Sequence, residues 1–351
     1  MKFTRSIILA AVFALTLIAA STAHAEDSLP MIYPELLKPG DTVMFVAPAG
    51  PPKREEVMRG KDRIESRGYK VKMRDDLFDV EGYLAGSDER RAEEMMEAFT
   101  DPEVKAVICV RGGYGVMRML ERLDFDKIRA NPKVVIGFSD ITALHAALNR
   151  RAGLVSFHGP GPASGLGGEK PPTDFTAEYV VRALEAVGDG REFTEYSIEV
   201  PESVSKVAAF GTGKARGRLV GGNLSLISAL EGTPYAVDTR DAILLIEDVN
   251  EAPYRIDRIL QQLKLAGKLA EIKGAVLGQF TEDFVREDKL TDDKRFDVTG
   301  VLTQYFADAG IPVLVNFPIG HHKQNATVPL GAQVEIDADA KVLRILQDEK
   351  K

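Results

Sequence analysis

The stretch that decides the fold is VKAVICVRGGYG, Val104 to Gly115. Its first seven residues form a nearly continuous apolar run, which is typical of a strand buried on both faces of a parallel sheet. The run leads directly into a glycine-rich loop, and a helical pattern follows. Because glycines carry no Cβ, such a loop offers its backbone amides to a group that approaches closely. We therefore expect a site at this edge of a sheet.

The order of strand, turn and helix recurs on both sides of this stretch, up to about residue 160. Further strand candidates are TVMFVA (42–47), YKVKM (69–73), KVVIGF (133–138) and LVSFHGP (154–160). Helical spacing covers 53–67 and 88–100, the second with an acidic, solvated face. This alternation predicts an α/β fold with a doubly wound, mostly parallel sheet. Sites in such sheets form at the carboxyl ends of strands, where Gly112–Gly115, Ser139 and His158 all lie.

The second half of the chain has a different texture. GPGPASGLGGEKPPT (159–173) lacks periodicity and predicts a surface loop or a linker, and a helix is expected at 177–187. Short β-like runs follow from about residue 193, interrupted by helices at 223–230 and 254–265. We expect an N-terminal domain at 26–185 and a mixed α+β domain at 186–351.

The first 25 residues are typical of a secretory signal peptide. Lys2 and Arg5 precede an uncharged, mostly apolar stretch, and an Ala-x-Ala site ends at Ala25. A membrane anchor is the alternative, but the apolar run is short for a bilayer span. We expect cleavage after Ala25 and no stable membrane insertion afterwards. With Cys109 as the only cysteine no intrachain disulfide can form, and export without disulfides favours a bacterial periplasm.

Charge and motif content exclude several functions. The formal net charge is −8, and removing Lys2 and Arg5, with no acidic residue before Glu26, makes it −10. Such a charge disfavours nucleic acid as a partner. The chain has no His-Glu-x-x-His motif and no Cys/His cluster, so we expect no metal. The loop at Gly112 is neither a Walker loop nor a dinucleotide fingerprint, and we expect no cofactor.

Ser139 lies in KVVIGFSDITALH, Lys133 to His145. A strand, a tight turn and a helix form the geometry of a nucleophile elbow, which lifts a hydroxyl above the sheet. The match to Gly-x-Ser-x-Gly is partial, because Ile141 replaces the second glycine. The alternative is that Ser139 caps the following helix.

A serine nucleophile also needs a base, an acid and oxyanion donors. Four histidines remain after cleavage. The position of His145 in the helix after Ser139 predicts that its side chain lies in the core or on the surface. His158 is either structural or part of the cleft. His321 and His322 form a pair in a loop after a strand, where one of them can present an imidazole. The apolar run 242–246 delivers Glu247 and Asp248 to a strand end, and the Gly112 loop with the Asp140 amide can supply oxyanion donors.

The chain resembles one family, the LD-carboxypeptidases, serine peptidases that include the microcin C immunity proteins. The segments that carry the resemblance span nearly the whole chain after residue 25 and are LKPGDTVMFVAPAG, VICVRGGYGVMRML, VVIGFSDITALH, FHGP, GGNLSLISALEGTPY, LLIEDVNEAPYRIDRIL and FPIGHHKQNATVPLGA. The resemblance implies a Ser–Glu–His triad of Ser139, Glu247 and His321. It also implies oxyanion donors at Gly112, Gly113 and the Asp140 amide.

The same resemblance implies the fold and the reaction. The fold is an N-terminal domain like class I glutamine amidotransferases and a C-terminal swivelling β/β/α domain, with the site between them and homodimers common. The reaction is removal of terminal D-Ala from murein tetrapeptides. The family member that trims recycled murein peptides usually works in the cytoplasm, whereas the predicted signal peptide implies export of this chain.

Two further residues are candidates for substrate binding, and three other functions are open. Arg111 can hold the terminal carboxylate or form a structural salt bridge, and Asn223 can bind the peptide or cap its helix. The alternatives to a murein carboxypeptidase are a microcin C-like immunity peptidase, an amidase or esterase with the same triad, and a non-catalytic periplasmic muropeptide-binding protein. The motifs do not separate the carboxypeptidase from the immunity branch.

Overall fold

The computed structural model describes residues 29–163, 165–187, 190–281 and 296–347. The chain divides into a short unit, Met1–Pro30, and a second unit, Met31–Lys351, which carries both sheets. The predicted signal peptide, Met1–Ala25, lies outside the described residues. In the described ranges no helix combines the length and the apolar character that crossing a bilayer requires.

The first sheet has six strands in the order β12-β5-β4-β3-β1-β2. Five are parallel and come from the N-terminal half: β1 (Thr42–Val46), β2 (Lys70–Lys72), β3 (Val104–Cys109), β4 (Val134–Gly137) and β5 (Ser156–His158). The edge strand β12 (Val328–Leu330) comes from the end of the chain and pairs antiparallel with β5. The parallel sheet predicted from the strand and helix alternation is therefore confirmed.

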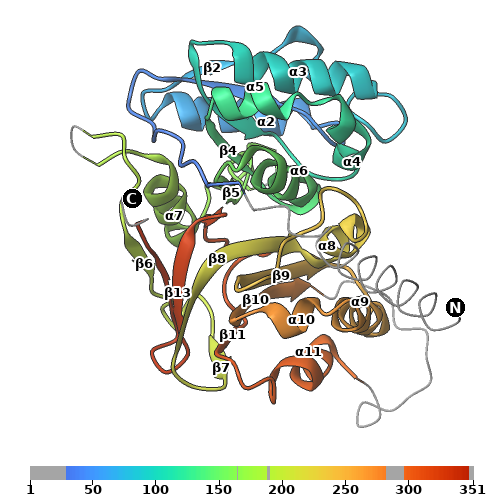
Figure 1. Cartoon of the computed structure of the whole chain (residues 1–351). Helices are drawn as coiled ribbons and strands as arrows, with labels where there is room; N and C mark the ends of the chain where they lie inside the picture. The colour runs from blue at the N-terminus through green and yellow to red at the C-terminus, as the bar shows by residue number, and fades with distance from the viewer. Residues whose placement is uncertain (1–28, 164, 188–189, 282–295, 348–351) are drawn as a thin grey trace, which may run out of the picture. The chain divides into compact units, whose positions relative to one another are not determined.

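Helices cover both faces of this sheet (Figure 1). They are α2 (Arg54–Glu65), α3 (Asp88–Thr100), α4 (Val116–Met119), α5 (Phe125–Ala130), α6 (Thr142–Ala147) and α7 (Asp174–Leu184). Short turns of 3₁₀-helix, η1 (Asp75–Phe78), η2 (Leu120–Arg122) and η3 (Ser139–Ile141), and a π-helical segment, η4 (Leu148–Ala152), link them. Residues of β1 alternate between two cores: Met44 and Val46 pack on the side of α3 to α6, and Val43 and Phe45 on the side of α2 and α7. This is the two-sided burial expected of a parallel sheet.

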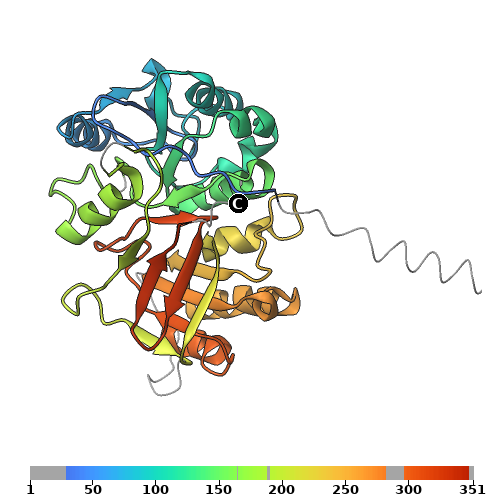
Figure 2. The same cartoon turned by 60° about the vertical axis from the view of Figure 1, so that its left-hand side comes forward.

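The second sheet has eight strands in the order β6-β14-β13-β8-β9-β10-β11-β7. Its strands are β6 (Tyr196–Ile198), β7 (Ala208–Phe210), β8 (Lys214–Asn223), β9 (Ile243–Val249), β10 (Gly274–Thr281), β11 (Val313–Val315), β13 (Gln333–Asp337) and β14 (Val342–Ile345). The strands β8 to β11 are parallel, and the outer strands are antiparallel. Its helices are α8 (Leu224–Leu230), α9 (Pro253–Leu265), α10 (Lys268–Glu271) and α11 (Val298–Phe306). The mixed architecture predicted for this half is confirmed (Figure 2).

The segment 159–173 differs from a free linker. It packs on α2, because Arg59 Nε donates a hydrogen bond of 2.8 Å to the carbonyl of Gly167, and Arg63 Nη2 donates one of 2.9 Å to that of Gly168. The sequence misses this packing because no periodicity reports it. The predicted domain boundary at 185/186 stays a prediction, and β12 shows that the first sheet also uses a strand from beyond it.

Candidate active site

Ser139 lies at a strained turn between β4 and α6. Its φ angle is 65°, a left-handed conformation that non-glycine residues seldom adopt and that concentrates at functional sites. The short helix η3 begins at Ser139, so the residue in the cap position is Phe138, and no side-chain cap hydrogen bond forms there. The geometry is therefore that of the predicted elbow, and the capping alternative is wrong.

His145 supports the elbow from below. The ring is fully buried, with Nε2 2.9 Å from the Gly137 carbonyl and Nδ1 2.8 Å from Ser156 Oγ. Burial lowers the pKa of His145 to about 3, so the ring is neutral. Because a carbonyl can only accept, Nε2 donates to Gly137 and Nδ1 accepts from Ser156. The core role predicted as one option for His145 is confirmed.

The Gly112 loop packs directly against the elbow. A Cβ at position 112 would lie 2.8 Å from the Cβ of Ser139 and 3.1 Å from the Asp140 amide nitrogen, so only glycine fits there. The Asp140 carboxylate is buried and accepts a hydrogen bond of 2.9 Å from the Val116 amide, which ties the far end of the loop to the elbow. The backbone at Gly112 and the amide of Asp140 therefore lie beside Ser139, as predicted, and their role as oxyanion donors stays a prediction.

Helix α3 holds the same loop with a buried arginine that the sequence did not reveal. Arg91 is fully buried, and its Nη1 donates to the carbonyls of Pro48, at 2.6 Å, and Gly115, at 2.8 Å. Its Nη2 pairs with Asp88. One guanidinium thus joins the loop after β1 to the loop after β3. Only the position of Arg91 on the inner face of its helix could have signalled this role.

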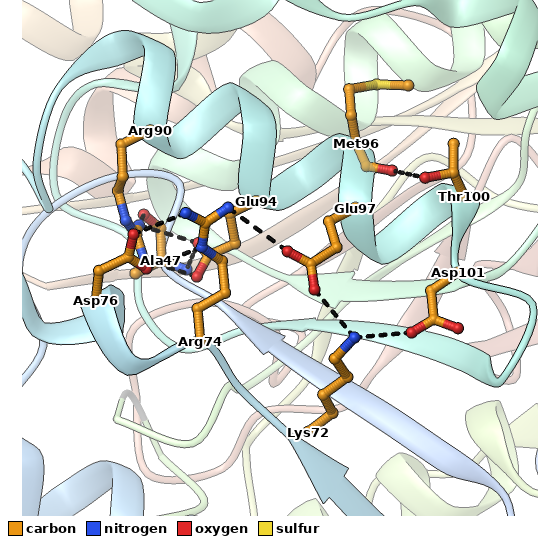
Figure 3. Close-up of polar contacts among 10 residues, drawn as sticks. All are labelled: Ala47, Lys72, Arg74, Asp76, Arg90, Glu94, Met96, Glu97, Thr100 and Asp101. Atoms are coloured by element: carbon orange, nitrogen blue, oxygen red, sulfur yellow. Dashed lines mark hydrogen bonds and ion pairs between the residues drawn. The ribbon is translucent and has the colours of Figure 1, made fainter.

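A second buried charge on α3 fixes the end of β1 (Figure 3). The Glu94 carboxylate accepts a hydrogen bond of 2.8 Å from the Ala47 amide and pairs with Arg90 at 2.7 Å. Burial raises the pKa of Glu94 to about 7, against the opposing effect of Arg90. Arg90 also pairs with Asp76, from which Arg74, Glu97 and Lys72 extend the network to the surface. The loop after β1 is therefore held by a network of ion pairs and hydrogen bonds that runs from the core to the surface.

Glu247 and His321 form the central polar contact of the site. The Oε2 atom of Glu247 lies 2.7 Å from Nδ1 of His321. Burial alone would raise the pKa of Glu247, which is fully buried, but the imidazoles of His158 and His321 outweigh it and hold that pKa at about 2. The carboxylate is thus ionised and accepts from Nδ1–H, which leaves Nε2 of His321 as the acceptor that a base requires.

The loop after β11 presents His321 toward the elbow. Its ring lies against the ring of Phe138, with centroids 4.8 Å apart, which places it beside the residue that precedes Ser139. The adjacent His322 is exposed, so the structure distinguishes the two histidines. Among the described residues, Ser139 Oγ makes no hydrogen bond to His321. Such bonds often tighten only when substrate binds.

Both candidate substrate-binding residues lie near these groups. Arg111 is half-buried, donates a hydrogen bond of 3.1 Å to the Pro51 carbonyl, and pairs with no acidic side chain in the described part of the chain. The alternative of a structural salt bridge therefore has no support. Asn223 caps α8 and donates a hydrogen bond of 2.9 Å to Asp248, so the capping alternative is confirmed, and its role in binding stays a prediction.

The site joins the two sheets, and of the residues that join them the sequence analysis missed Thr142. The Asn223 amide nitrogen at the end of β8 donates a hydrogen bond of 2.9 Å to Thr142 Oγ1 on α6, the helix after the elbow. His158, at the end of β5, lies near Glu247 of β9. Among the described residues, no cluster of three or more metal-ligating side chains is present.

Comparison with known proteins finds the same family in both halves of the chain. Residues 43–159 match the family described as LD-carboxypeptidase N-terminal domain, and 216–336 match the LD-carboxypeptidase C-terminal domain. A probable murein peptide carboxypeptidase of Bacillus subtilis is 39% identical over 88% of this chain and 92% of its own length.

Solved structures of relatives share the fold, among them the following two. The microcin C7 self-immunity protein MccF superposes with a TM-score of 0.81, at 27% identity over 91% of this chain and all of its own. A muramoyltetrapeptide carboxypeptidase from Oxalobacter formigenes gives a TM-score of 0.74, at 32% identity over 88% of this chain and all of its own.

Proposed function

Since the chain belongs to the LD-carboxypeptidase family of serine peptidases, we propose that it removes the terminal D-Ala of murein tetrapeptides through Ser139, His321 and Glu247. The observation that carries this proposal is the 2.7 Å contact between Glu247 and His321, with the His321 ring against Phe138 and next to the strained Ser139. An acid that orients an imidazole beside a serine elbow is the arrangement that acyl transfer requires.

In the proposed mechanism His321 Nε2 takes the proton of Ser139 while Oγ attacks the carbonyl carbon of the amide before D-Ala. Glu247 stabilises the imidazolium that forms. The amides of the Gly112–Gly113 loop and of Asp140 stabilise the tetrahedral oxyanion, and each such donor contributes about 10² to 10³ in rate. His321 then protonates the leaving amine of D-Ala. A water molecule, deprotonated by His321, releases the tripeptide from Ser139.

A carboxypeptidase also recognises the free terminal carboxylate of its substrate. Arg111 is our candidate because it lies at the start of the Gly112 loop and has no acidic partner among the described residues. A guanidinium matches the two oxygens of a carboxylate. Asn223 is the second candidate. It lies at the carboxyl end of β8 in the second sheet, next to Glu247 in the pairing of β8 with β9.

The test is turnover of a disaccharide tetrapeptide into tripeptide and free D-Ala. We expect Ser139→Ala to bind this substrate and to lose roughly 10⁵-fold or more in kcat. His321→Ala should lose a similar factor, and His322→Ala, at the exposed neighbouring histidine, serves as the matched control with near-normal turnover. Full turnover by Ser139→Ala would remove the nucleophile assignment.

The immunity peptidase is a second candidate function, and the likeness to MccF favours it. One structure of that protein is a complex with aspartyl sulfamoyl adenosine. Competition between this compound and the tetrapeptide separates the branches: inhibition only at far higher concentration than the tetrapeptide's KM supports a murein substrate. Simple esters and L-Ala peptides, tested beside D-Ala peptides, separate a general esterase or amidase.

Export and dimerisation are parts of the proposal that depend on the sequence alone. The proposed periplasmic location depends on Met1–Ala25, and N-terminal sequencing of the protein from fractionated cells tests cleavage after Ala25. The proposed homodimer is tested by the mass of the purified protein in solution.

A further inference from the structure

His158 is a buried histidine with no assigned task. It ends β5, where it pairs with Gly137 at the end of β4, the strand that leads to the elbow, and its side chain is fully buried. Neither ring nitrogen has a hydrogen-bond partner within the described residues. A buried polar group left without a partner costs free energy, so its presence calls for an explanation. The nearest acidic group is Glu247, whose Oε1 lies 3.7 Å from Nε2 of His158.

Glu247 has the complementary deficit. Its Oε2 accepts from His321, but its Oε1 has no hydrogen-bond donor within the described part of the chain. A buried, ionised carboxylate is stable only when donors satisfy its oxygens. The other imidazole near His158 belongs to His145, 6.4 Å away between ring centroids, and both of its nitrogens are already engaged. His158 is therefore the group whose position allows it to donate a hydrogen bond to Oε1 of Glu247.

We infer that His158 is a positioning residue for the Ser–Glu–His site: protonated at Nε2, it holds Oε1 of Glu247 and so fixes the carboxylate that orients His321. This inference rests on the proposed function. The 3.7 Å separation exceeds a hydrogen bond of about 2.7 to 3.2 Å by about 0.5 to 1 Å, so a small shift of either side chain closes it. His158 is not the base itself, because it is fully buried, whereas the His321 side chain is 16% exposed and lies against Phe138.

The arrangement also joins the two sheets at the point of catalysis. His158 belongs to the first sheet and Glu247 to the second. The backbone of β8 supports the ring from its edge, since a Cβ at Gly222 would lie 3.3 Å from Cδ2 of His158. The orientation of His321 therefore depends on how closely the ends of β5 and β9 approach.

The experiment compares His158→Leu, which removes the donor at similar volume, with His158→Gln, whose amide can place a donor near the Nε2 position. We expect kcat for the disaccharide tetrapeptide to fall about 10-fold to 100-fold in the leucine variant, by analogy with the loss of residues that orient metal ligands, with KM within about twofold. The glutamine variant should recover most of this loss. Thr239→Val, at a buried hydroxyl bonded to Glu271, controls for general destabilisation, because Thr239 precedes β9 whereas Glu247 lies toward the other end of that strand.

A spectroscopic measurement separates positioning from packing. The proton between Nδ1 of His321 and Oε2 of Glu247 should give a downfield NMR signal that is absent in His321→Ala. We expect this signal to move or broaden in His158→Leu and to return in His158→Gln, while Thr239→Val leaves it unchanged. If the leucine variant does not fold, the comparison moves to His158→Asn, which cannot reach the Nε2 position and should remain impaired where His158→Gln is active.

The outcomes divide as follows. A leucine variant with normal kcat overturns the inference, and so does an equal loss in the leucine and glutamine variants, because packing and not a donor would then be responsible. The proposed function fails separately: if Ser139→Ala turns over the tetrapeptide normally, the site assignment itself is wrong, whatever the His158 variants do.

Discussion

At the scale of single residues, the site depends on the surroundings of Glu247. Its carboxylate is removed from water and remains ionised because imidazoles face it. Two backbone segments press on its side chain: Cβ atoms at Gly278 and Gly320 would each lie 3.0 Å from the Cβ of Glu247. The Glu247 side chain thus has little free space at its base, which favours the preorganised site that catalysis requires.

Gly320→Ala should therefore lower activity by displacing the carboxylate of Glu247. The φ angle at this position is 124°, and the new Cβ would lie 2.7 Å from Oε2 of Glu247, the oxygen that orients His321. Because a displacement of about 1 Å can cost about 10²-fold in rate, we expect kcat for the tetrapeptide to fall by about that factor, with KM little changed. Steady-state kinetics on the purified variant provide the measurement.

The matched control is Gly40→Ala. Its φ angle is 95°, so alanine is strained there too, but no atom lies within 4 Å of the added Cβ. Thermal unfolding reports the strain in both variants, and only Gly320→Ala should lose kcat. Equal kcat values in the two variants would mean that the Cβ added at position 320 does not displace the Glu247 carboxylate.

The sequence revealed these residues unequally. Ser139 and Glu247 lie at strand ends after apolar runs, a pattern that predicts where a side chain reaches a site edge. The choice of His321 over His322 depended on the family resemblance, because adjacent loop residues have no periodicity to separate them. His158 could not be assigned, since its importance comes from Glu247, a residue on a distant strand.

At the scale of elements, α3 shows what a correct helix prediction leaves out. The bounds expected from its spacing, 88–100, are those observed. Its acidic surface was also expected, but Arg90, Arg91 and Glu94 are buried. Amphipathic periodicity counts charged residues as solvated, so it does not reveal a charge that is buried because backbone carbonyls and amides of neighbouring loops satisfy it.

Arg91→Met should loosen both loops at the site. The substitution keeps most of the apolar volume but leaves the carbonyls of Pro48 and Gly115 without their donor, at a cost of about 1 to 3 kcal/mol each. We expect a lower free energy of unfolding and a fall in kcat of about 10-fold or more, because the Gly112 loop supplies the proposed oxyanion donors. Urea unfolding and tetrapeptide kinetics measure the two effects.

Arg122→Met is the control for this change. Arg122 pairs with Glu89 on the surface, where ion pairs contribute about 0 to 1 kcal/mol. It should leave stability and kcat nearly unchanged. A normal kcat in a folded Arg91→Met protein would show that the loop holds its shape without the arginine.

At the scale of the whole unit Met31–Lys351, the candidate site lies where the ends of two sheets meet. The strand and helix alternation predicted the first sheet, and short β-like runs predicted the mixed second half, because both patterns are local signals. They did not predict that β12 returns to the first sheet, nor the contacts of His158 with Glu247 and of Thr142 with Asn223. Such contacts depend on how the sheets assemble, which no short stretch of sequence encodes.

Because the elbow is built on a buried neutral histidine, acid should destabilise the fold through His145. Its folded pKa is about 3, below the ordinary 6.5, so between these values the unfolded chain binds a proton that the folded chain does not. Stability from this residue is therefore complete above pH 6.5 and is lost as the pH falls toward 3, with a slope of up to about 1.4 kcal/mol per pH unit.

His145→Gln removes the titrating group and leaves other buried acids, such as Glu247, unchanged in both proteins. Urea unfolding at pH 7, 6, 5 and 4 should show that the difference in free energy of unfolding between the wild type and His145→Gln shrinks steadily as the pH falls. The control is Ser205→Ala, which loses only a hydroxyl bonded to the Asn316 carbonyl, and its difference from the wild type should stay constant. A wild-type advantage over His145→Gln that does not change with pH would mean that folding does not lower the pKa of His145.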